Sequence, residues 1–450
     1  MLTTQESALR RGTLEDERSA IGSGAAAPAA DGQPRRGLIE TVQRLPTFDA
    51  LHFGVYRLLF VGQGCTSMGM WMDQLARGWL LYQLTSSPMQ LGLLQGLQAL
   101  PLLLLSPVAG TAADRYDRKL QMLVAPALSA LMFAAVALLI MTDLIEPWHV
   151  YVSAFLSSTM ATFHQPARTA MIADAVPRQH LTNAIALTSV FFNVSRSVSP
   201  AVAGALIALY GTQAAYVAQA GLCALAALVT LPLPDSLRFS AGPAAHHARS
   251  RSFGRNILEG WRFSWSDQTV RASLLIVTSA SLFILPFTTM LPVYARDILE
   301  VGPSGQGMLL TAMGIGALGS SVLVASIGDR LPRGILMLGG VTLYGVAVVA
   351  FAASPWFPLS VALMVIAGFF HVSSHTLTQV VVQSYTPAEF RGRTMGVLQQ
   401  THMVQLIGGM AMGALASVAG APSAIAAMAV AGALAMIAIA LTVPTARRIR

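Results

Sequence analysis

Long, uninterrupted apolar segments recur along this chain, and each is about as long as a membrane-spanning helix. Only 11% of the 450 residues are charged, against roughly 25% in an average soluble domain. A helix needs about 20 apolar residues to cross the hydrocarbon core, so the segments predict an all-α integral membrane protein. Their unbroken character disfavours a transmembrane β-barrel, whose strands alternate. The twelve expected spans are about 56–82, 89–109, 120–141, 148–173, 182–209, 213–232, 271–295, 304–327, 335–353, 357–383, 394–419 and 422–443.

The spans form two sets of six, separated by a polar segment. Residues 46–57 and 257–263 mix aromatic, apolar and basic side chains, as amphipathic helices on a membrane surface do. The expected organisation is a disordered cytoplasmic tail over 1–44, a six-helix bundle over 45–232, a cytoplasmic linker with an amphipathic helix over 233–270, a second six-helix bundle over 271–443 and a basic cytoplasmic tail over 444–450.

Basic residues are distributed unequally between the two sides of the expected bundle. Of the 28 Lys and Arg residues, 25 fall in the tails, the linker and the loops of one side. Arg77 and Arg196 lie within spans, and Arg296 alone occupies the other side. The positive-inside rule therefore predicts cytoplasmic termini and a multi-pass protein of a bacterial inner membrane. The bases gather on no soluble face, so no nucleic-acid partner is expected.

The two sets of spans repeat each other. Asp114 opens a D-R-x-x-R sequence after the second span, and Asp329 opens another after the eighth, 215 positions later. Pro177 before the fifth span corresponds to Pro387 before the eleventh, 210 positions later. Parallel six-helix repeats are typical of secondary transporters, which bind substrate between the halves near the midplane.

The loop from Gly110 to Lys119 resembles the G-x-x-x-D-R-x-x-R-R/K signature of the major facilitator superfamily (MFS). Further matching stretches are 71–85, 164–168 (HQPAR), 291–295 (LPVYA) and 390–393 (FRGR). Together they resemble the branch of the enterobactin exporter and related drug efflux proteins. The chain departs from that branch at Ser199, which precedes Pro200 where Gly is usual, and at Asp73, where Gln is common.

The resemblance implies two lobes that rock between inward-open and outward-open states, with a gate at the cytoplasmic side. In that gate Asp114 would lie near Arg391 or Arg393, and Arg118 would reach Asp174. Such contacts form when the lobes meet on the inner side. The gate residues that the resemblance implies are Gly110, Asp114, Arg115, Arg118, Asp174, Asp329, Arg330, Arg333, Arg391 and Arg393.

Asp73 is the only acidic residue well inside an apolar span, and a charge there normally faces a cavity or a partner. Arg77 lies one turn further on the same face. Two interpretations stay open, a neutralised structural pair and a protonatable coupling or substrate site. Arg196, near the middle of the fifth span, would bind an anionic substrate, neutralise Asp73 or join a structural network.

His371 and His375 are spaced i, i+4 on the tenth span, and histidine titrates near neutral pH. Without a third ligand they favour polar lining or proton sensing over a metal site; His402 and His164 are weaker candidates. Several Gln residues and aromatics are possible cavity lining, and six glycines suit close helix packing. These sets are Gln63, Gln95, Gln98, Gln379, Gln383, Trp79 and Phe287, and Gly314, Gly316, Gly319, Gly408, Gly409 and Gly413.

The chain has no P-loop, nucleophile triad or ligand cluster, so neither an enzyme nor a bound cofactor or metal is expected. The predicted function is secondary active export of small amphipathic molecules, a drug or a siderophore-like metabolite, by proton antiport. The expected partners are a small-molecule substrate and the lipid bilayer, and the expected state is a monomer. The alternatives are an importer of the same fold and a non-transporting receptor or assembly factor.

The predicted topology can be tested by cysteine labelling. A cysteine at Ala245 should be cytoplasmic and one at Gly302 external, because the basic loops mark the inner side. An impermeant maleimide added to intact cells should label only the second. Equal labelling of both positions would contradict the topology.

Overall fold

A computed structural model of the chain describes residues 46–234, 253–327, 333–387, 389–401, 403–443 and 445–448. All regular structure within these ranges is helical. The first half contains η1 (Pro46–His52), α3 (Gly54–Thr85), α4 (Pro88–Arg115), α5 (Arg118–Met141), α6 (Pro147–Ala175), η2 (Arg178–His180), α7 (Leu181–Tyr210) and α8 (Thr212–Thr230). The second half contains α9 (Phe253–Ser266), α10 (Gln268–Ser279), η5 (Ala280–Ile284), η6 (Leu285–Met290), α11 (Leu291–Val293), η7 (Tyr294–Ile298), α12 (Gly302–Ile327), α13 (Arg333–Ala352), α14 (Phe357–Tyr385), α15 (Arg391–Thr401), α16 (Val404–Ala419), α17 (Ala421–Thr442) and α18 (Thr445–Arg448).

Nine helical segments of the described chain are long and apolar enough to cross a membrane, and α16 is a shorter apolar helix. The long helices α3 and α6 are not among the nine, since polar residues such as Asp73, Arg77, His164 and Arg168 lower their hydropathy. The helical membrane architecture expected from the sequence is therefore confirmed, while the count of twelve spans stays a prediction.

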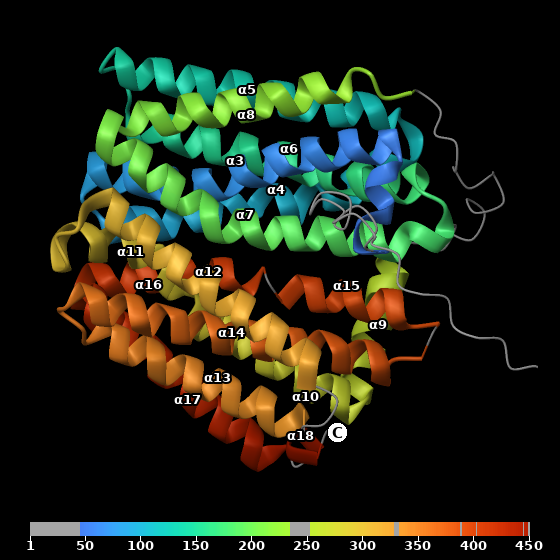
Figure 1. Cartoon of the computed structure of the whole chain (residues 1–450). Coiled ribbons are helices and arrows are strands. Elements are labelled where there is room, and N and C mark those ends of the chain that lie inside the picture. The colour runs from blue at the N-terminus through green and yellow to red at the C-terminus, as the bar shows by residue number, and fades with distance from the viewer. Residues whose placement is uncertain are drawn as a thin grey trace, which may run out of the picture. The chain divides into compact units, whose positions relative to one another are not determined.

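The helices pack in two groups that follow the chain (Figure 1). In the first half α3 packs against α7 and α8, α4 against α6, and α5 against α6 and α8. In the second half α12 packs against α14, and α13 against α14 and α17. The halves meet mainly where α4 packs on α16 and α7 on α12. Each half thus contributes two helices to the interface.

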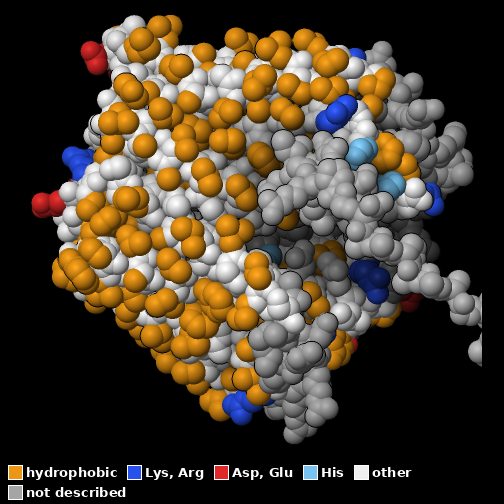
Figure 2. All heavy atoms as spheres, in the orientation of Figure 1, with side chains coloured by type: hydrophobic (Ala, Val, Ile, Leu, Met, Phe, Trp, Pro, Cys, Tyr) orange, Lys and Arg blue, Asp and Glu red, His pale blue; other side chains and the backbone are white. Residues whose placement is uncertain are grey.

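Hydrophobic side chains cover the flanks of the helices, and charged side chains gather toward their ends (Figure 2). Leu131, Leu209, Val322 and Leu441 are each about two-thirds exposed or more. An apolar surface of this extent is expected where lipid is the solvent.

The two ends of the bundle differ in their turns and charges. The end carrying Asp143, Glu146, Asp297 and Glu300 is called the acidic end; its turns contain all the described residues with positive φ. The other end, with the turns at 116–117, 176–180 and 386–390, is called the basic end. The positive-φ residues are Ser86, Asp143, Gly211, Glu300, Gly302 and Gly420.

Glycines bring the two halves into close contact in the acidic half of the interface. A methyl group on Gly92 of α4 would lie 2.9 Å from the carbonyl oxygen of Gly409 on α16. One on Gly307 of α12 would lie 2.6 Å from the carbonyl oxygen of Pro200 on α7. Toward the basic end Gly110 has no neighbour within 4 Å of such a methyl group. The halves are therefore in closest contact at the acidic end.

The predicted packing role holds for Gly314, Gly316, Gly408, Gly409 and Gly413, each of which lies against a neighbouring helix. It is wrong for Gly319, where an added methyl group would meet nothing within 4 Å. A small residue allows a close approach but does not require one.

Two expected spans are irregular. The span predicted over 271–295 is a succession of α-, π- and 3-10-helical turns from Gln268 to Ile298. Pro286 and Pro292 explain this, because proline lacks the N–H donor and its ring displaces the carbonyl one turn earlier. The span predicted over 394–419 is divided between α15, which ends at Thr401, and α16, which begins at Val404.

Gly368 offers a test of packing in the second half. Its added methyl group would overlap the backbone carbonyl of Met313 on α12. Gly368→Ala should therefore lower the free energy of unfolding by about 1–3 kcal/mol, the usual cost of overpacking. The matched change Gly319→Ala should be neutral or stabilising by up to about 1 kcal/mol through helix propensity. Thermal unfolding in detergent compares the two, and equal melting temperatures would contradict this account.

Candidate functional site

A groove lies between α4 and α6, extending from the middle of both helices toward the basic end. Its volume is about 480 Å³. Six of its ten lining residues carry a hydroxyl or carboxamide group, and none of these described residues has an ionisable side chain. The rest of the lining is apolar, so the groove suits a ligand with both apolar and hydrogen-bonding parts. The lining consists of Gln98, Leu102, Ser106 and Gly110 from α4 and Ser158, Ala161, Thr162, Gln165, Pro166 and Thr169 from α6.

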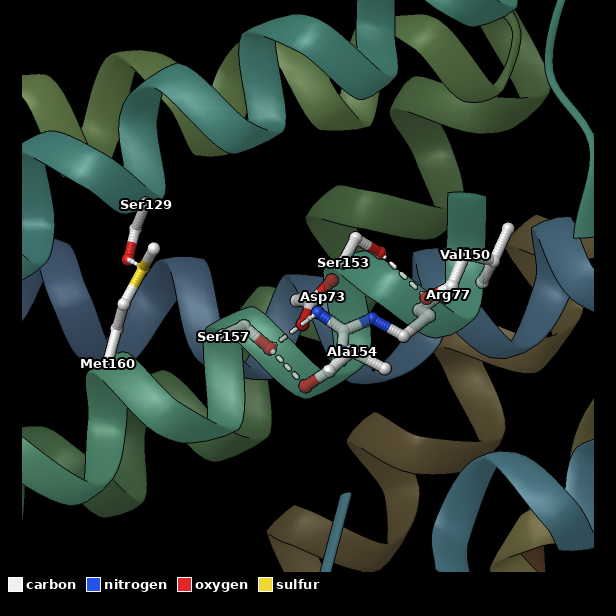
Figure 3. A network of polar contacts seen from close by, with 8 residues as sticks. All are labelled: Asp73, Arg77, Ser129, Val150, Ser153, Ala154, Ser157 and Met160. Carbon is white, nitrogen blue, oxygen red and sulfur yellow. Dashed lines mark hydrogen bonds and ion pairs between the residues drawn. The ribbon is translucent and has the colours of Figure 1, made fainter. Parts of the chain in front are cut away.

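Asp73 and Arg77 form a buried ion pair one turn apart on α3, with Nη2 of Arg77 donating to Oδ2 of Asp73. The side chains are 12% and 3% exposed, respectively. Nη2 of Arg77 also donates to Oγ of Ser157 on α6 at 2.8 Å (Figure 3). Within the described chain, Oδ1 of Asp73 has no hydrogen-bond partner. The pair is thus neutralised within the first half and leaves one carboxylate oxygen unengaged.

Arg196 of α7 lies against another face of α3, away from Asp73. Its guanidinium carbon lies 5.5 Å from the ring centroid of Trp71, a cation–π arrangement. Trp71 and Asp73 are two residues apart on a helix and therefore point in nearly opposite directions. The carboxylate that sequence analysis considered as a partner of Arg196 is instead paired with Arg77.

The two predicted histidines lie in the second half. His371 and His375 on α14 have ring centroids 6.5 Å apart, and His371 lies 5.2 Å from the ring of Tyr344 on α13. Their position beside an aromatic ring is compatible with the predicted polar lining or proton sensing, which stays a prediction. His164 lies on α6 with Arg168, and His402 lies outside the described residues.

The glutamines expected as cavity lining have different environments. Gln98 lines the groove. Gln63 accepts a hydrogen bond from Arg168 and so ties α3 to α6. Gln95 donates from Nε2 to Oγ1 of Thr289 across the interface at 3.2 Å. The aromatic candidates Trp79 and Phe287 are instead buried in the apolar core.

At the basic end, Nη1 of Arg118 donates to Oδ2 of Asp174 at 2.6 Å and ties the start of α5 to the end of α6. This is the pairing that the resemblance implied. It lies wholly within the first half, since both residues belong to helices of that half. Its part in gating stays a prediction.

Arg393 of the FRGR stretch contacts the linker helix. Its Nη1 lies 2.7 Å from Oε2 of Glu259 on α9, and the rings of Phe390 and Phe263 stack at 4.9 Å. Trp261 of α9 also donates to Oε1 of Gln400 at 2.8 Å. The predicted amphipathic helix thus docks on α15.

The remaining predicted gate residues that the structure describes lie on the side of the basic end. Gly110 lines the groove, Arg333 begins α13 and Arg391 begins α15. Asp329 and Arg330 lie outside the described residues. The backbones of Asp114 and Arg115 end α4, and their side chains are outside what the structure describes.

A polar network joins the halves at the acidic end, and sequence analysis did not identify it. The Tyr82 hydroxyl at the end of α3 donates to Oδ2 of Asp297 on η7. Arg296 donates from Nη1 to the carbonyl of Tyr82 at 3.0 Å and to Oγ of Ser86 at 3.1 Å. The sequence feature that could have indicated this network is Arg296, because it is the one basic residue on an otherwise acidic side.

These contacts give the two ends different states. The acidic end is held by glycine packing, the Gln95–Thr289 hydrogen bond and the Tyr82–Asp297–Arg296 network. From the middle of α4 and α6 the groove extends away from these contacts, toward the basic end. A bundle closed at one end with a polar site extending toward the other is one state of an alternating-access membrane transporter.

Comparisons with known proteins identify the class. The MFS family model described as "transmembrane secretion effector" matches residues 46–449, and the chain belongs to this family of transporters. The multidrug efflux pump Tap of Mycolicibacterium fortuitum is 30% identical over 328 residues, covering 71% of this chain and 78% of that protein. The staphyloferrin A transporter of Staphylococcus aureus is 23% identical over 361 residues, covering 78% and 87%.

The fold agrees with a solved MFS-like structure. A bacterial homologue of the human lysosomal transporter Spinster, in an inward-facing and occupied conformation, superposes with a TM-score of 0.67. The identity is 15%, over 88% of this chain and 97% of that one. The predicted membership in the efflux and siderophore branch of the superfamily is confirmed, and so is the fold class.

The ion pair of Asp73 predicts a specific instability. Asp73→Asn should lower stability by about 3–5 kcal/mol, because it leaves the Arg77 guanidinium buried without its counter-charge. Adding Arg77→Gln should restore most of the loss. Denaturation of the single and double variants in detergent measures both effects. A single variant as stable as the parent would show that the pair has no structural role.

The acidic-end network predicts a conformational bias. Tyr82→Phe removes one hydrogen bond between the halves, of about 1 kcal/mol, and should shift the ratio of open to closed acidic ends about fivefold. A cysteine at Thr289, in the interface, should then be alkylated faster from the acidic-end side. Tyr210→Phe, an exposed tyrosine at the same end, is the control. Unchanged alkylation in Tyr82→Phe would exclude the network as a latch.

Proposed function

We propose that this protein is a secondary active exporter of small amphipathic molecules that works by alternating access. The observation that carries the proposal is the unequal state of the two ends, with tight contact at the acidic end and a polar groove extending toward the basic end. The relatives named as a multidrug efflux pump and a staphyloferrin A transporter favour outward transport of drug-like or siderophore-like molecules.

The proposed orientation places the basic end and both termini in the cytoplasm of a bacterial inner membrane. The distribution of 25 of the 28 basic residues supports it. In that orientation the described conformation faces inward, which is the state in which an exporter takes up its substrate.

The proposed energy source is the proton gradient, with Asp73 as the coupling group. Its carboxylate lies inside the first half, and its Oδ1 atom, unengaged among the described residues, can receive a proton. A proton there would remove the charge that holds Arg77, leaving that guanidinium with Ser157 on α6. The contact between α3 and α6 would then depend on protonation, which gives a physical link between proton binding and helix packing.

Export and coupling can be tested in one set of strains. Expression of the chain should raise resistance to some members of a panel of toxic amphipathic compounds and lower their accumulation. In inverted vesicles a pH gradient should drive uptake of the same compounds. Asp73→Asn should abolish this uptake yet spare downhill exchange, because a neutral amide cannot exchange a proton.

Asp73→Asn combined with Arg77→Gln is the matched control for stability. Since this double variant restores charge balance without a titratable carboxylate, it should fold yet remain uncoupled. Full gradient-driven uptake by either variant would remove Asp73 from the coupling mechanism. A complete absence of export by the parent chain for the whole panel would contradict the proposed function.

A further inference from the structure

Where α4 and α6 of the first half border a groove, the corresponding described positions of the second half are in contact. By the 210-residue repeat, α6 (Pro147–Ala175) corresponds end to end with α14 (Phe357–Tyr385). Gln98 of the groove corresponds to Met313 by the 215-residue repeat, and Ser158 corresponds to Gly368 by the 210-residue repeat. An added methyl group on Gly368 would overlap the carbonyl of Met313, so α12 and α14 are in contact at that point. The same positions of the first half line open volume.

The sequence explains why α4 and α6 are further apart at these positions than α12 and α14. Gly316 and Gly368 let α12 and α14 approach closely, and the corresponding positions of the first half hold Pro101 and Ser158. Proline and serine prevent an equally close approach, and proline also breaks the regular hydrogen bonding of α4. The second half shows that this fold can pack the two helices tightly. The open groove is therefore a property of these particular residues rather than of the repeat.

The chemistry of the lining defines a ligand class. Three hydroxyl groups donate to carbonyls of their own helices: Ser106 to Leu102 at 2.5 Å, Thr162 to Ser158 at 2.7 Å and Thr169 to Gln165 at 3.0 Å. Their oxygens are left as acceptors facing a ligand. The carboxamides of Gln98 and Gln165 supply both donors and acceptors.

The uncharged lining of the groove also favours an uncharged ligand. Among the described lining residues none could neutralise a cation or an anion, and an unpaired charge is costly away from bulk water. Arg168 of α6 is engaged with Gln63 of α3. Lipid tails would leave the carboxamides of Gln98 and Gln165 without hydrogen-bond partners. A volume of about 480 Å³ lies within the range of roughly 300–1,000 Å³ that drug-sized ligands occupy.

We propose that the α4–α6 groove is a binding site for the uncharged, hydrogen-bond-donating part of an amphipathic substrate, one with hydroxyl or amide N–H groups. The site is formed by helices of the first half. The inference rests on the proposed export function, for which it names the substrate class.

Substrate protection tests the site in the full-length protein in membrane vesicles. The reporter is Ala161→Cys, an exposed groove position, in a background with Cys65→Ala and Cys223→Ala. Chloramphenicol, a neutral compound with hydroxyl and amide groups, should slow alkylation of this cysteine about fivefold at a concentration of about four times its Kd. Ethidium, a permanent cation, should protect weakly. Gln179→Cys, exposed in the turn before α7, is the control and should not be protected by either compound.

A change of charge tests the proposed selectivity. Gln165→Glu supplies the groove with a carboxylate, so ethidium should protect the 161 reporter about tenfold better than before, and chloramphenicol no better. Filling the groove with Ala161→Phe should abolish resistance to chloramphenicol, whereas Ala135→Phe, on an exposed face of α5, should not.

The outcomes separate this inference from the proposed function. Export of panel compounds without protection at position 161 by chloramphenicol would overturn the groove site and leave export intact. Protection without export of any compound would support the site and overturn the exporter. Equal protection by ethidium and chloramphenicol in the parent chain would overturn the assignment of an uncharged ligand.

Discussion

Close contact between helix backbones at glycine residues holds the two halves of this protein together. In a bilayer apolar surfaces gain little by leaving lipid, so helices associate through tight packing and polar contacts. Gly92 and Gly409 bring α4 onto α16, and Gly307 brings α12 onto α7. These contacts lie in the acidic half of the interface. Because they are absent at Gly110, the halves can close at one end while polar surface extends toward the other.

Small departures from the internal repeat separate the roles of the two halves. Where the second half has Gly316 and Gly368 and packs tightly, the first half has Pro101 and Ser158 and leaves a groove. The first half also contains the Asp73–Arg77 ion pair, and the second holds His371 and His375 near Tyr344. One fold repeated twice thus gives a close-packed half and a half with a polar recess, since a few side chains decide how near two helices come.

Buried charge is kept within the first half by local pairing. Arg77 neutralises Asp73 one turn away on α3 and reaches Ser157 on α6, so a charged pair inside the membrane costs less than either ion alone. Arg196 avoids the same face and lies over Trp71. At the acidic end Tyr82, Asp297 and Arg296 join the halves, where water is near and a polar network can be broken and remade.

The helical membrane architecture and the family could be predicted from the sequence, because apolar run length and loop motifs are local properties. The pairing of Arg118 with Asp174 was implied by the family resemblance, and the structure contains it. The sequence also put Asp73 and Arg77 on one face, since helix periodicity is fixed. The position of Arg196 over Trp71, the contact of Arg393 with Glu259 and the hydrogen bond from Tyr82 to Asp297 could not be predicted from the sequence. These contacts depend on the rotation and approach of separate helices, which no local sequence pattern specifies. The groove could not be predicted from the sequence either, because Pro101 and Ser158 keep two helices apart only where the fold places α4 beside α6.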